Sequence, residues 1–395
     1  MKTRSEQECA FNPPPAADPP ATHKVAAFPG RYIQGEGTLN QLPDLIARRG
    51  GHGLILASPS AANKVLHNHP TDFTAHETHM ETFRGECCEP ELERVAGLIR
   101  KRKSKVIVGM GGGKTIDTAK IAADTAGLPV IIVPTIASTD APCSGCAVVY
   151  SPDGVFQRVF YQRSNPQVVL VDTRVIANAP TRFLVAGMGD ALSTWFEARS
   201  CHRTHSRNEC GGLSTLTGLA LAELCYETLL AHGLAAKTAC SHQVVTPALE
   251  RIVEANILLS GIGFESSGLA TAHSVHNGLS ALPETHAFFH GEKVAIGVLT
   301  GLHLTDAPPS EMAAVYAFCE AIGLPTTLEE IGITEDSPEY LLDAATKACA
   351  PAEGIHHEAG TITPSMVRDA LIAADAMGRA RKHPLPPPAH PGPGH

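Results

Sequence analysis

Short apolar runs alternate with helical patterns along the first half of the chain, between residues 30 and 175. The runs are rich in Val and Ile and nearly free of polar residues, which is typical of parallel strands buried on both faces of a sheet. They are GLILAS, KVIVGM, PVIIVPT and QVVLVD, at residues 53–58, 105–110, 129–135 and 167–172. Amphipathic helical spacing fills segments 90–103 and 115–127 between them. This alternation predicts a doubly wound α/β domain.

Two further patterns complete the expected fold. CAVVYSPDGVFQRVFY, residues 146–161, predicts an antiparallel hairpin that turns at Pro152-Asp153-Gly154. After residue 183 the strand-like runs stop, and helices are predicted at residues 189–200, 218–233, 246–263, 268–282, 291–304 and 338–350. The segment CHRTH, residues 201–205, is interpreted as a solvated loop. The second half is therefore expected to be all-α, with the active site in the cleft between the halves, because ligands favour domain interfaces.

Composition narrows the classes of partner. The chain carries 40 Asp and Glu against 31 Lys and Arg, a net charge of -9, and its basic run RKRKSK at 100–105 is interpreted as a helix end that enters a strand. No nucleic-acid partner is expected. There is no run of about 18 apolar residues, so no membrane span is expected, and residues 1–25 lack the apolar stretch of a secretory signal. Eleven scattered cysteines suit a reducing cytoplasm better than a disulfide framework.

The stretch KVIVGMGGGKTIDTAK, residues 105–120, is close to two phosphate-binding motifs and matches neither. A Walker A loop would need glycine where Val108 stands, and the Rossmann fingerprint would need glycine where Lys114 stands. The stretch still follows a buried strand and opens a helix, and its glycines allow close approach to an anion at the helix N-terminus. It predicts a diphosphate site; the alternative is a tight turn without a ligand.

A polar loop follows the next strand. VPTIASTDAPCS, residues 133–144, places Asp140 among small hydroxyl side chains at the carboxyl edge of the sheet, where ligands of open α/β folds bind. An Asx or Ser/Thr turn explains the same residues equally well. Cys143 and Cys146 form a C-x-x-C pair, but no second pair follows at zinc-ribbon spacing, so a metal or redox role is not expected.

Histidines gather in the helical half. His273 and His276 are three residues apart and share one face of a predicted helix, His290 begins the next, and Asp190 lies near the start of another. Two imidazoles and a carboxylate suit a divalent metal with an open coordination position. With 20 histidines in the chain, surface or core positions remain the alternative for any one of them.

Six stretches together resemble the glycerol dehydrogenases of the iron-containing (group III) alcohol dehydrogenase superfamily, over about residues 28–378. In the family's order they are GGGKTIDTAK, VPTIASTDAPCS, GMGDALSTWFEAR, HQVVTPALERIVEAN, GFESSGLATAHSVHNGL and HGEKVAIG. The resemblance implies the dehydroquinate synthase-like architecture: an α/β N-terminal dinucleotide-binding domain at residues 25–180 and an all-α C-terminal metal-binding domain at residues 181–380. The Pro-rich ends, residues 1–24 and 381–395, are expected to be disordered.

The resemblance also implies roles for individual residues. NAD would bind along Ser58, Gly111, Gly112, Gly113, Lys114, Thr135, Ser138, Ser144, Cys146 and Tyr150. Asp140 would contact the substrate hydroxyls, and Asp190, His273 and His290 would hold one divalent metal, zinc in this branch. The wider superfamily often adds a histidine ligand where this chain has Thr194. Relatives form large homo-oligomers, often octamers.

The expected reaction is the metal-dependent oxidation of glycerol and related vicinal diols to dihydroxyacetone, with reduction of NAD+. The alternatives are a phosphorylated polyol as substrate, as in glycerol-1-phosphate dehydrogenases, a P-loop kinase or ATPase, and a non-catalytic descendant that binds only coenzyme. Two positions depart from the family: Ser58 replaces the usual ribose-binding aspartate, and Cys146 replaces a usual leucine. Arg84, commonly glycine in the family, is expected near the adenine end of the coenzyme.

Overall fold

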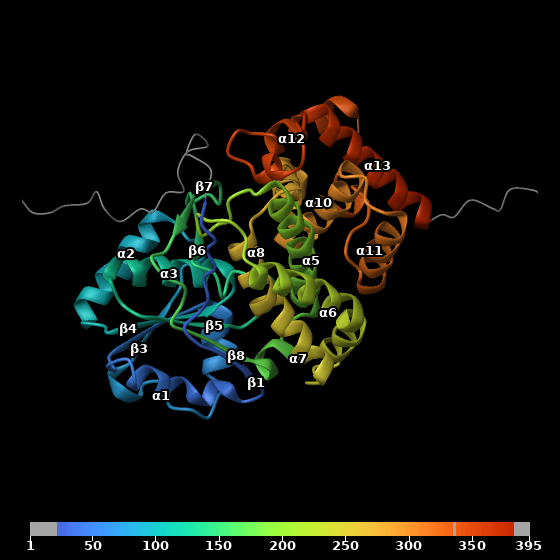
Figure 1. The fold of residues 1–395 in the computed structure, drawn as a ribbon. Coiled ribbons are helices and arrows are strands. Elements are labelled where there is room, and N and C mark those ends of the chain that lie inside the picture. The colour runs from blue at the N-terminus through green and yellow to red at the C-terminus, as the bar shows by residue number, and fades with distance from the viewer. Residues whose placement is uncertain (1–21, 335–336, 383–395) are drawn as a thin grey trace, which may run out of the picture.

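Six parallel strands form the sheet of the first half of the chain, in the order β1-β8-β5-β4-β2-β3 (Figure 1). The computed structural model describes residues 22–334 and 337–382. The strands of the sheet are β1 Tyr32–Gly35, β2 Gly53–Ala57, β3 His79–Thr82, β4 Val106–Gly111, β5 Val130–Pro134 and β8 Val168–Asp172. The four buried runs of the sequence are β2, β4, β5 and β8, so the predicted parallel sheet is confirmed.

The sheet edges and the hairpin complete this half. β6 Cys146–Tyr150 and β7 Phe156–Tyr161 form the expected antiparallel hairpin, which turns at Gly154 with φ of 81°. β1 pairs with β8 at one edge and was not predicted, because its four residues YIQG are only partly buried and contain no continuous apolar run. β3 lies at the other edge, beside β2.

Helices cover both faces of the sheet, as the apolar runs require. Leu54 and Leu56 pack in one apolar cluster with residues of α2 and α3, whereas Ile55 packs in a second cluster with residues of α1. Alternate side chains of a strand point to opposite faces, so the whole strand is buried. The helices are α1 Leu42–Ala47, α2 Glu89–Arg102, α3 Gly113–Ala126 and the short α4 Thr173–Ala177.

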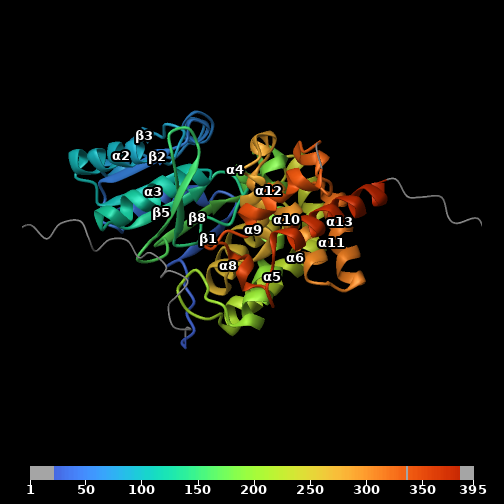
Figure 2. The same cartoon turned by 90° about the horizontal axis from the view of Figure 1, so that it is seen from above.

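The second half is helical throughout its described part, as predicted (Figures 1 and 2). Its helices are α5 Thr181–Thr204, α6 Leu216–Ser241, α7 Pro247–Glu254, α8 Ser260–Ser267, α9 Thr271–Leu279, α10 His290–Leu304, α11 Pro309–Ile322, α12 Pro338–Ala348 and α13 Pro364–Lys382. One apolar cluster includes Ile116 of α3, Met188 of α5 and Val298 of α10, so the two halves share a continuous core.

The end of α5 and the two ends of the chain differ in part from the sequence predictions. The interpretation of CHRTH as a solvated loop was wrong: residues 201–204 form the last turn of α5, where Cys201 is fully buried. At the N-terminal side, the backbone of His23 and of Val25 hydrogen-bonds to Leu213. The predicted C-terminal tail starts too early, because residues 381 and 382 still belong to α13. Residues 1–21 and 383–395 of the two predicted tails lie outside the described residues.

Candidate active site

The glycine turn lies between β4 and α3, at the carboxyl edge of the sheet. A Cβ atom at Gly111 would stand 2.9 Å from the Cβ atom of Ser58, so the ends of β2 and β4 approach too closely there for a side chain. At Gly113 the nearest atom to a Cβ would be Thr139 Oγ1, at 4.0 Å, which leaves the start of α3 open. An open helix N-terminus with unpaired backbone N–H groups is the geometry that binds a diphosphate.

Lys114 of this turn already has a partner. Its Nζ atom lies 2.5 Å from Oε2 of Glu86 and 5.3 Å from the centroid of the Tyr150 ring. Glu86 was not among the predicted site residues. A diphosphate bound at the turn would compete with the Glu86 carboxylate for Lys114.

The neighbouring strand ends hold two more predicted coenzyme residues. The backbone N–H of Ser58 donates to the carbonyl of Met110 over 2.9 Å, and that of Thr135 donates to the carbonyl of Gly111 over 3.0 Å. The ends of β2, β4 and β5 are therefore tied together. Gly112 completes the turn between β4 and α3.

A buried lysine organises the loop that follows β5. Lys120 of α3 is fully buried, and its Nζ donates to the carbonyls of Ala141 and Cys146, at 2.5 and 2.8 Å. The hydroxyl of Ser144 lies 3.4 Å from the same Nζ and is also buried. Ser138, earlier in the loop, is partly exposed. The structure thus places Ser144 and Cys146 against Lys120.

The three predicted metal ligands come together from three helices. Asp190 lies on α5, His273 on α9 and His290 at the first position of α10, and one ligand atom of each lies within 4.8 Å of the others. Oδ1 of Asp190 is 3.0 Å from Nε2 of His290 and 3.5 Å from Nε2 of His273. The donors converge on one point, as a metal centre requires.

Two glycines allow this convergence. A Cβ atom at Gly291, next to His290, would lie 1.8 Å from the carbonyl oxygen of Ala186 on α5. A Cβ atom at Gly189, next to Asp190, would lie 2.3 Å from the carbonyl oxygen of Gly291. The helix backbones therefore touch at this crossing, which brings the two ligands to hydrogen-bond distance.

Outer partners fix both imidazole rings. Nδ1 of His273 is 2.6 Å from Oε2 of the buried Glu197, and Nδ1 of His290 is 3.0 Å from Nε2 of His276. In each ring Nδ1 is engaged, so Nε2 is the nitrogen that faces Asp190. A carboxylate or other acceptor behind a histidine is the usual support of a metal ligand, and the residues present fit a divalent cation.

The protonation state of Asp190 also fits a divalent cation. Burial by itself raises the pKa of the Asp190 carboxyl, but His290 and His273 together bring it below its usual value. Asp190 is therefore held as a carboxylate, the form in which it can ligate a metal.

Asp140 lies directly beside this cluster. Its backbone N–H donates to Oδ2 of Asp190 over 3.2 Å, and its own Oδ2 accepts from the hydroxyl of Ser260 over 2.9 Å. The Ser260 hydroxyl lies 2.9 Å from that of Thr194, the residue that replaces the additional histidine ligand of the wider superfamily. Burial and the neighbouring Asp190 carboxylate raise the pKa of Asp140 well above its usual range. The loop after β5 thus reaches the helical half.

Comparison with known proteins agrees with this geometry. Residues 29–173 match the family model described as iron-containing alcohol dehydrogenase. A glycerol dehydrogenase of Thermotoga maritima is 53% identical over 90% of this chain and 98% of its own length. The chain belongs to the iron-containing alcohol dehydrogenase family. A glycolaldehyde reductase of Halobacterium salinarum is 43% identical over 90% of this chain and 98% of its own.

The fold comparison extends over the same span. The crystal structure of a probable glycerol dehydrogenase from Sinorhizobium meliloti superposes with a TM-score of 0.85 at 43% identity, covering 91% of this chain and 99% of that one. The α/β half and the helical half are therefore arranged as in the family.

Sequence reasoning missed the residues that support the site. Glu197 follows Asp190 by seven residues, two helical turns, so its position on the ligand face of α5 was available from spacing. Lys120 follows Ile116 by four residues and so lies on the buried face of α3. No signal in the sequence connects Glu86 with Lys114 or Ser260 with Asp140, since these pairs are far apart in the chain.

Proposed function

We propose that this family member oxidises glycerol and related vicinal diols to dihydroxyacetone or the corresponding ketone, using NAD+ and one divalent metal ion. The observation that carries the proposal is the cluster of Asp190, His273 and His290 next to Asp140. The relatives named glycerol dehydrogenase, of which the chain covers nearly the full length, support the substrate.

In this proposal residues 25–180 form the coenzyme-binding domain and residues 181–380 the metal-binding domain. The diphosphate of NAD binds at Gly111–Gly113 and Lys114, where α3 presents its open N-terminus. Thr135 and Tyr150 border the same turn. The remaining coenzyme contacts are assigned to Ser58, Ser138, Ser144 and Cys146.

Asp190, His273 and His290 would hold the metal, for which zinc fits two imidazoles and one carboxylate with an open position. When bound, the metal supplies Lewis acidity toward a substrate hydroxyl, and the coenzyme accepts hydride. Glu197 and His276 keep the two imidazoles oriented.

Asp140 is proposed to orient a second hydroxyl of the substrate. Its Oδ2 is occupied by Ser260, whereas its Oδ1 has no hydrogen-bond partner among residues 22–334 and 337–382. Oδ1 is therefore the atom left for a vicinal hydroxyl. This arrangement favours diols over simple alcohols.

Two alternatives are less well supported. A phosphorylated substrate would need free cations in the site, but Lys293 is 7% exposed and its Nζ donates to Ser280 Oγ over 2.7 Å. A non-catalytic descendant would not be expected to retain three convergent ligands with their outer partners.

The test is a spectrophotometric screen of NAD+ reduction with glycerol, 1,2-propanediol, butanediols and ethanol, before and after chelation. Glycerol and 1,2-diols should react best, and chelation should abolish turnover. His273→Ala should remove most metal and nearly all turnover while NAD binding persists. His303→Ala is the matched control, because His303 lies at the opposite end of α10 from His290 and its Nε2 atom is 3.2 Å from the Tyr316 hydroxyl. Full activity in metal-free protein, verified by elemental analysis, would overturn the proposal.

We also propose a cytoplasmic homo-oligomer, an octamer by resemblance. α6 is supporting evidence, since Leu216, Leu224 and Leu234 on it are 73, 47 and 54% exposed, and apolar patches of this kind mark interfaces. α6 is also the one helix in the described ranges whose length and composition would let it cross a membrane. Leu224→Glu should lower the mass measured by light scattering, whereas Met366→Glu on α13 should not.

The cysteines bear on the proposed compartment: the ten described cysteines are all free, which fits a reducing compartment.

A further inference from the structure

A cavity of about 410 Å³ lies at the amino edge of the sheet. Its wall contains residues that immediately precede strands: Arg31 before β1, Pro129 before β5 and Gln167 before β8. The coenzyme turn follows a strand, so it lies at the opposite edge of the parallel sheet. The cavity is therefore separate from the coenzyme turn, and its volume lies within the usual range of small-molecule sites.

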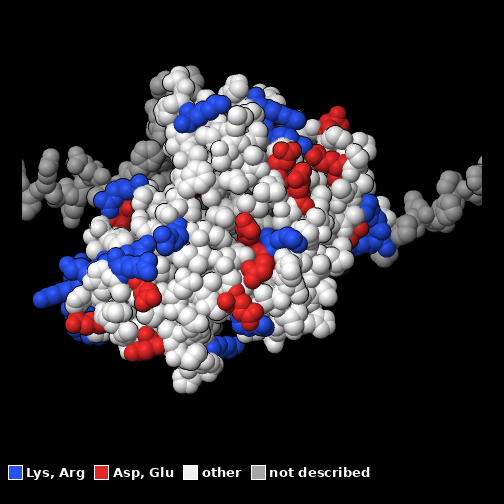
Figure 3. Space-filling view, turned by 60° about the horizontal axis from the view of Figure 1, so that its bottom comes forward, with Lys and Arg blue, Asp and Glu red and all other residues white. Residues whose placement is uncertain are grey.

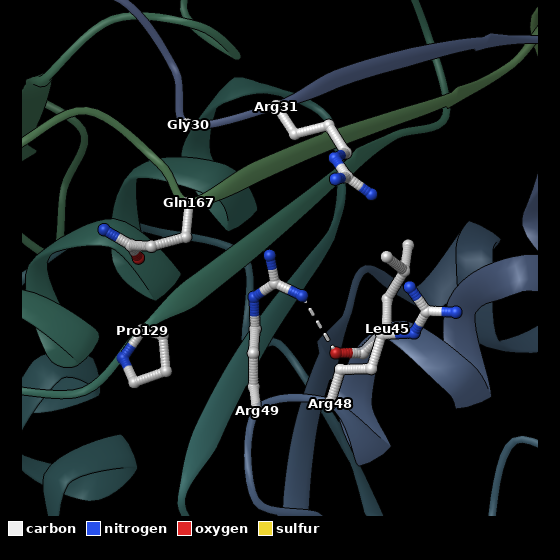
Figure 4. Close-up of a pocket in the computed structure, with 7 residues that line it drawn as sticks. All are labelled: Gly30, Arg31, Leu45, Arg48, Arg49, Pro129 and Gln167. Atoms are coloured by element: carbon white, nitrogen blue, oxygen red, sulfur yellow. Dashed lines mark hydrogen bonds between the residues drawn. The ribbon is translucent and has the colours of Figure 1, made fainter.

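Three arginines from two segments line this cavity (Figure 4). Arg48 and Arg49 follow α1, and Arg31 comes from the segment that enters β1. No carboxylate is among the lining residues, and none of the three guanidinium groups forms an ion pair with any residue that the structure describes. By contrast, Arg182 and Arg199 each form two hydrogen bonds to a single glutamate.

The three positive charges act on one another. Burial, and then Arg31 and Arg48, lower the pKa of Arg49 below its usual value. Within residues 22–334 and 337–382, the Arg49 guanidinium makes one hydrogen bond, which it donates to the carbonyl of Leu45 over 3.1 Å. Figure 3, in which the bottom of Figure 1 comes forward, shows several Lys and Arg side chains over the α/β half, with Asp and Glu side chains between them.

The end of α1 does not explain the cluster by itself. A helix C-terminus attracts cations, which accounts for Arg48 and Arg49. Arg31 comes from another segment, and the wall beside it is closely packed. A Cβ atom at Gly30 would lie 2.9 Å from the carbonyl oxygen of Gln167, and Oε1 of Gln167 accepts from the N–H of Val130 over 2.7 Å. The cavity is open to solvent, with Arg31 and Arg48 exposed and Arg49 partly buried, and its wall at Gly30 and Gln167 is closely packed.

We propose that this cavity binds a small phosphorylated metabolite, a phosphate monoester or diphosphate, as a site additional to that of the coenzyme. Guanidinium groups match the geometry of phosphate oxygens and bind them in pairs. Three guanidinium groups around one cavity suit a ligand with two or more negative charges, and the volume exceeds what inorganic phosphate needs. The bound anion would link α1 to the starts of β1, β5 and β8, and so stabilise the α/β half.

The test is calorimetric titration of the full-length protein with pyrophosphate, glycerol 3-phosphate, inorganic phosphate and citrate, in the presence of saturating NADH. The coenzyme then occupies the diphosphate turn at Lys114, so binding there does not contribute. We expect binding of pyrophosphate or glycerol 3-phosphate that is tighter than that of inorganic phosphate. Tightest binding of citrate would overturn the assignment to phosphates.

Variants locate the bound anion. Arg31→Gln combined with Arg49→Gln should weaken binding at least about tenfold, the effect of losing one charged hydrogen bond. Arg100→Gln combined with Lys101→Gln at the end of α2 removes the same charge outside the cavity and should change binding little. Arg48→Lys keeps the charge and loses the paired donors, so its affinity for the anion should lie between those of the two double variants. Absence of binding to the unaltered protein, or equal loss in both double variants, would disprove the site. Turnover with NAD+ and glycerol is measured on each variant, and it tests the proposed function independently.

Discussion

Nδ1 of His273 lies 2.6 Å from Oε2 of Glu197, and the other oxygen of the same carboxylate accepts from the backbone N–H of His273 and of Ala270. One buried side chain therefore holds both the ring and the backbone of His273, a proposed metal ligand. The ring is left with Nε2 directed at Asp190, 3.5 Å from Oδ1. Such support tunes metal affinity, since it fixes both the tautomer and the orientation of the imidazole.

Removal of this support should weaken the metal site. Glu197→Ala is expected to lower zinc affinity by about 10–100-fold, measured by competition with a chromophoric chelator. Glu197→Gln should lose less zinc affinity than Glu197→Ala, because its amide oxygen can still accept from Nδ1–H of His273. Coenzyme binding should stay unchanged in both. Glu311→Gln, which removes the charge from a partly buried pair with Arg199, is the control for loss of a carboxylate. Unchanged zinc affinity in Glu197→Ala would show that the contact only stabilises the fold.

The proposed role of Asp140 predicts a preference for substrates with two neighbouring hydroxyl groups. If Oδ1 orients a neighbouring hydroxyl, Asp140→Asn should raise KM for glycerol more than for 2-propanol, which has no second hydroxyl. A divalent cation bound at Asp190 would offset the charge of that carboxylate and so favour the ionised form of Asp140. The loss of a charge-assisted hydrogen bond then corresponds to roughly 1.5–3 kcal/mol, or roughly tenfold to a hundredfold in kcat/KM. Steady-state kinetics on both alcohols measure the difference. Equal losses would mean that Asp140 serves the structure of the loop and not the substrate.

Glu265 connects the halves and should make stability depend on pH. Its carboxylate accepts from the backbone N–H of Gly145 over 2.7 Å and from the amide of Asn165 over 2.5 Å. Burial is the main cause that raises the pKa of Glu265 from 4.5 to about 7. Between these values the folded protein holds a proton that the unfolded chain releases. The contribution of Glu265 to the free energy of unfolding is therefore largest below pH 4.5, falls as pH rises to about 7, and then stays constant.

Glu265→Gln checks this sign. The amide carries no charge at any pH, so the stability of the variant relative to the unaltered protein should improve between pH 5 and pH 8. A shift of this size sets an upper limit of roughly 3 kcal/mol on the change. Urea unfolding of both proteins at the two pH values measures it. A relative stability that declines over the same interval would mean that Glu265 is ionised when folded and stabilising in that form.

The chain pattern was sufficient for much of this molecule. Buried strands such as β4 contain continuous apolar runs, so their position and parallel arrangement followed from burial on both faces. The order of the motifs was enough to single out His273 and His290, the proposed ligands, and the structure brings both close to Asp190. β1 was not predicted, because its four half-buried residues at a sheet edge contain no continuous apolar run.

The hydrophobic pattern does not show which segments that are remote in the sequence come close together in the fold. The contact of Gly189 with Gly291 depends on how α5 crosses α10, and only the folded chain shows that a side chain would clash there. The arginine cavity was missed for the same reason, since Arg31 and Arg49 are distant in the chain and neither belongs to a motif. Local spacing predicts elements; it does not predict which polar residues meet between them.

Coenzyme choice depends on the end of β2. Ser58 stands beside the glycine turn, and its hydroxyl accepts from the N–H of Ala61 over 3.2 Å. An aspartate in this place would accept from the ribose 2′-hydroxyl of NAD and repel the 2′-phosphate of NADP. Serine carries no charge, so that repulsion is absent. β3 pairs with β2 alongside, which places the exposed Arg84 two residues beyond β3 at the same edge of the sheet.

We therefore expect both coenzymes to be used, with NAD preferred by a smaller margin than in relatives with aspartate. Ser58→Asp should lower kcat/KM with NADP by roughly tenfold or more, since each factor of ten corresponds to about 1.4 kcal/mol. Arg84→Gln should also lower NADP use if its guanidinium reaches the phosphate, while NAD use stays unchanged. Asn63→Asp, at an exposed position on the segment after Ser58, is the control for added charge; Ser60 would not serve, because its hydroxyl lies 3.2 Å from that of Ser58. The measurement is kcat/KM for both coenzymes in each protein. Complete rejection of NADP by the unaltered enzyme, or an unchanged ratio in Ser58→Asp, would place Ser58 away from the ribose.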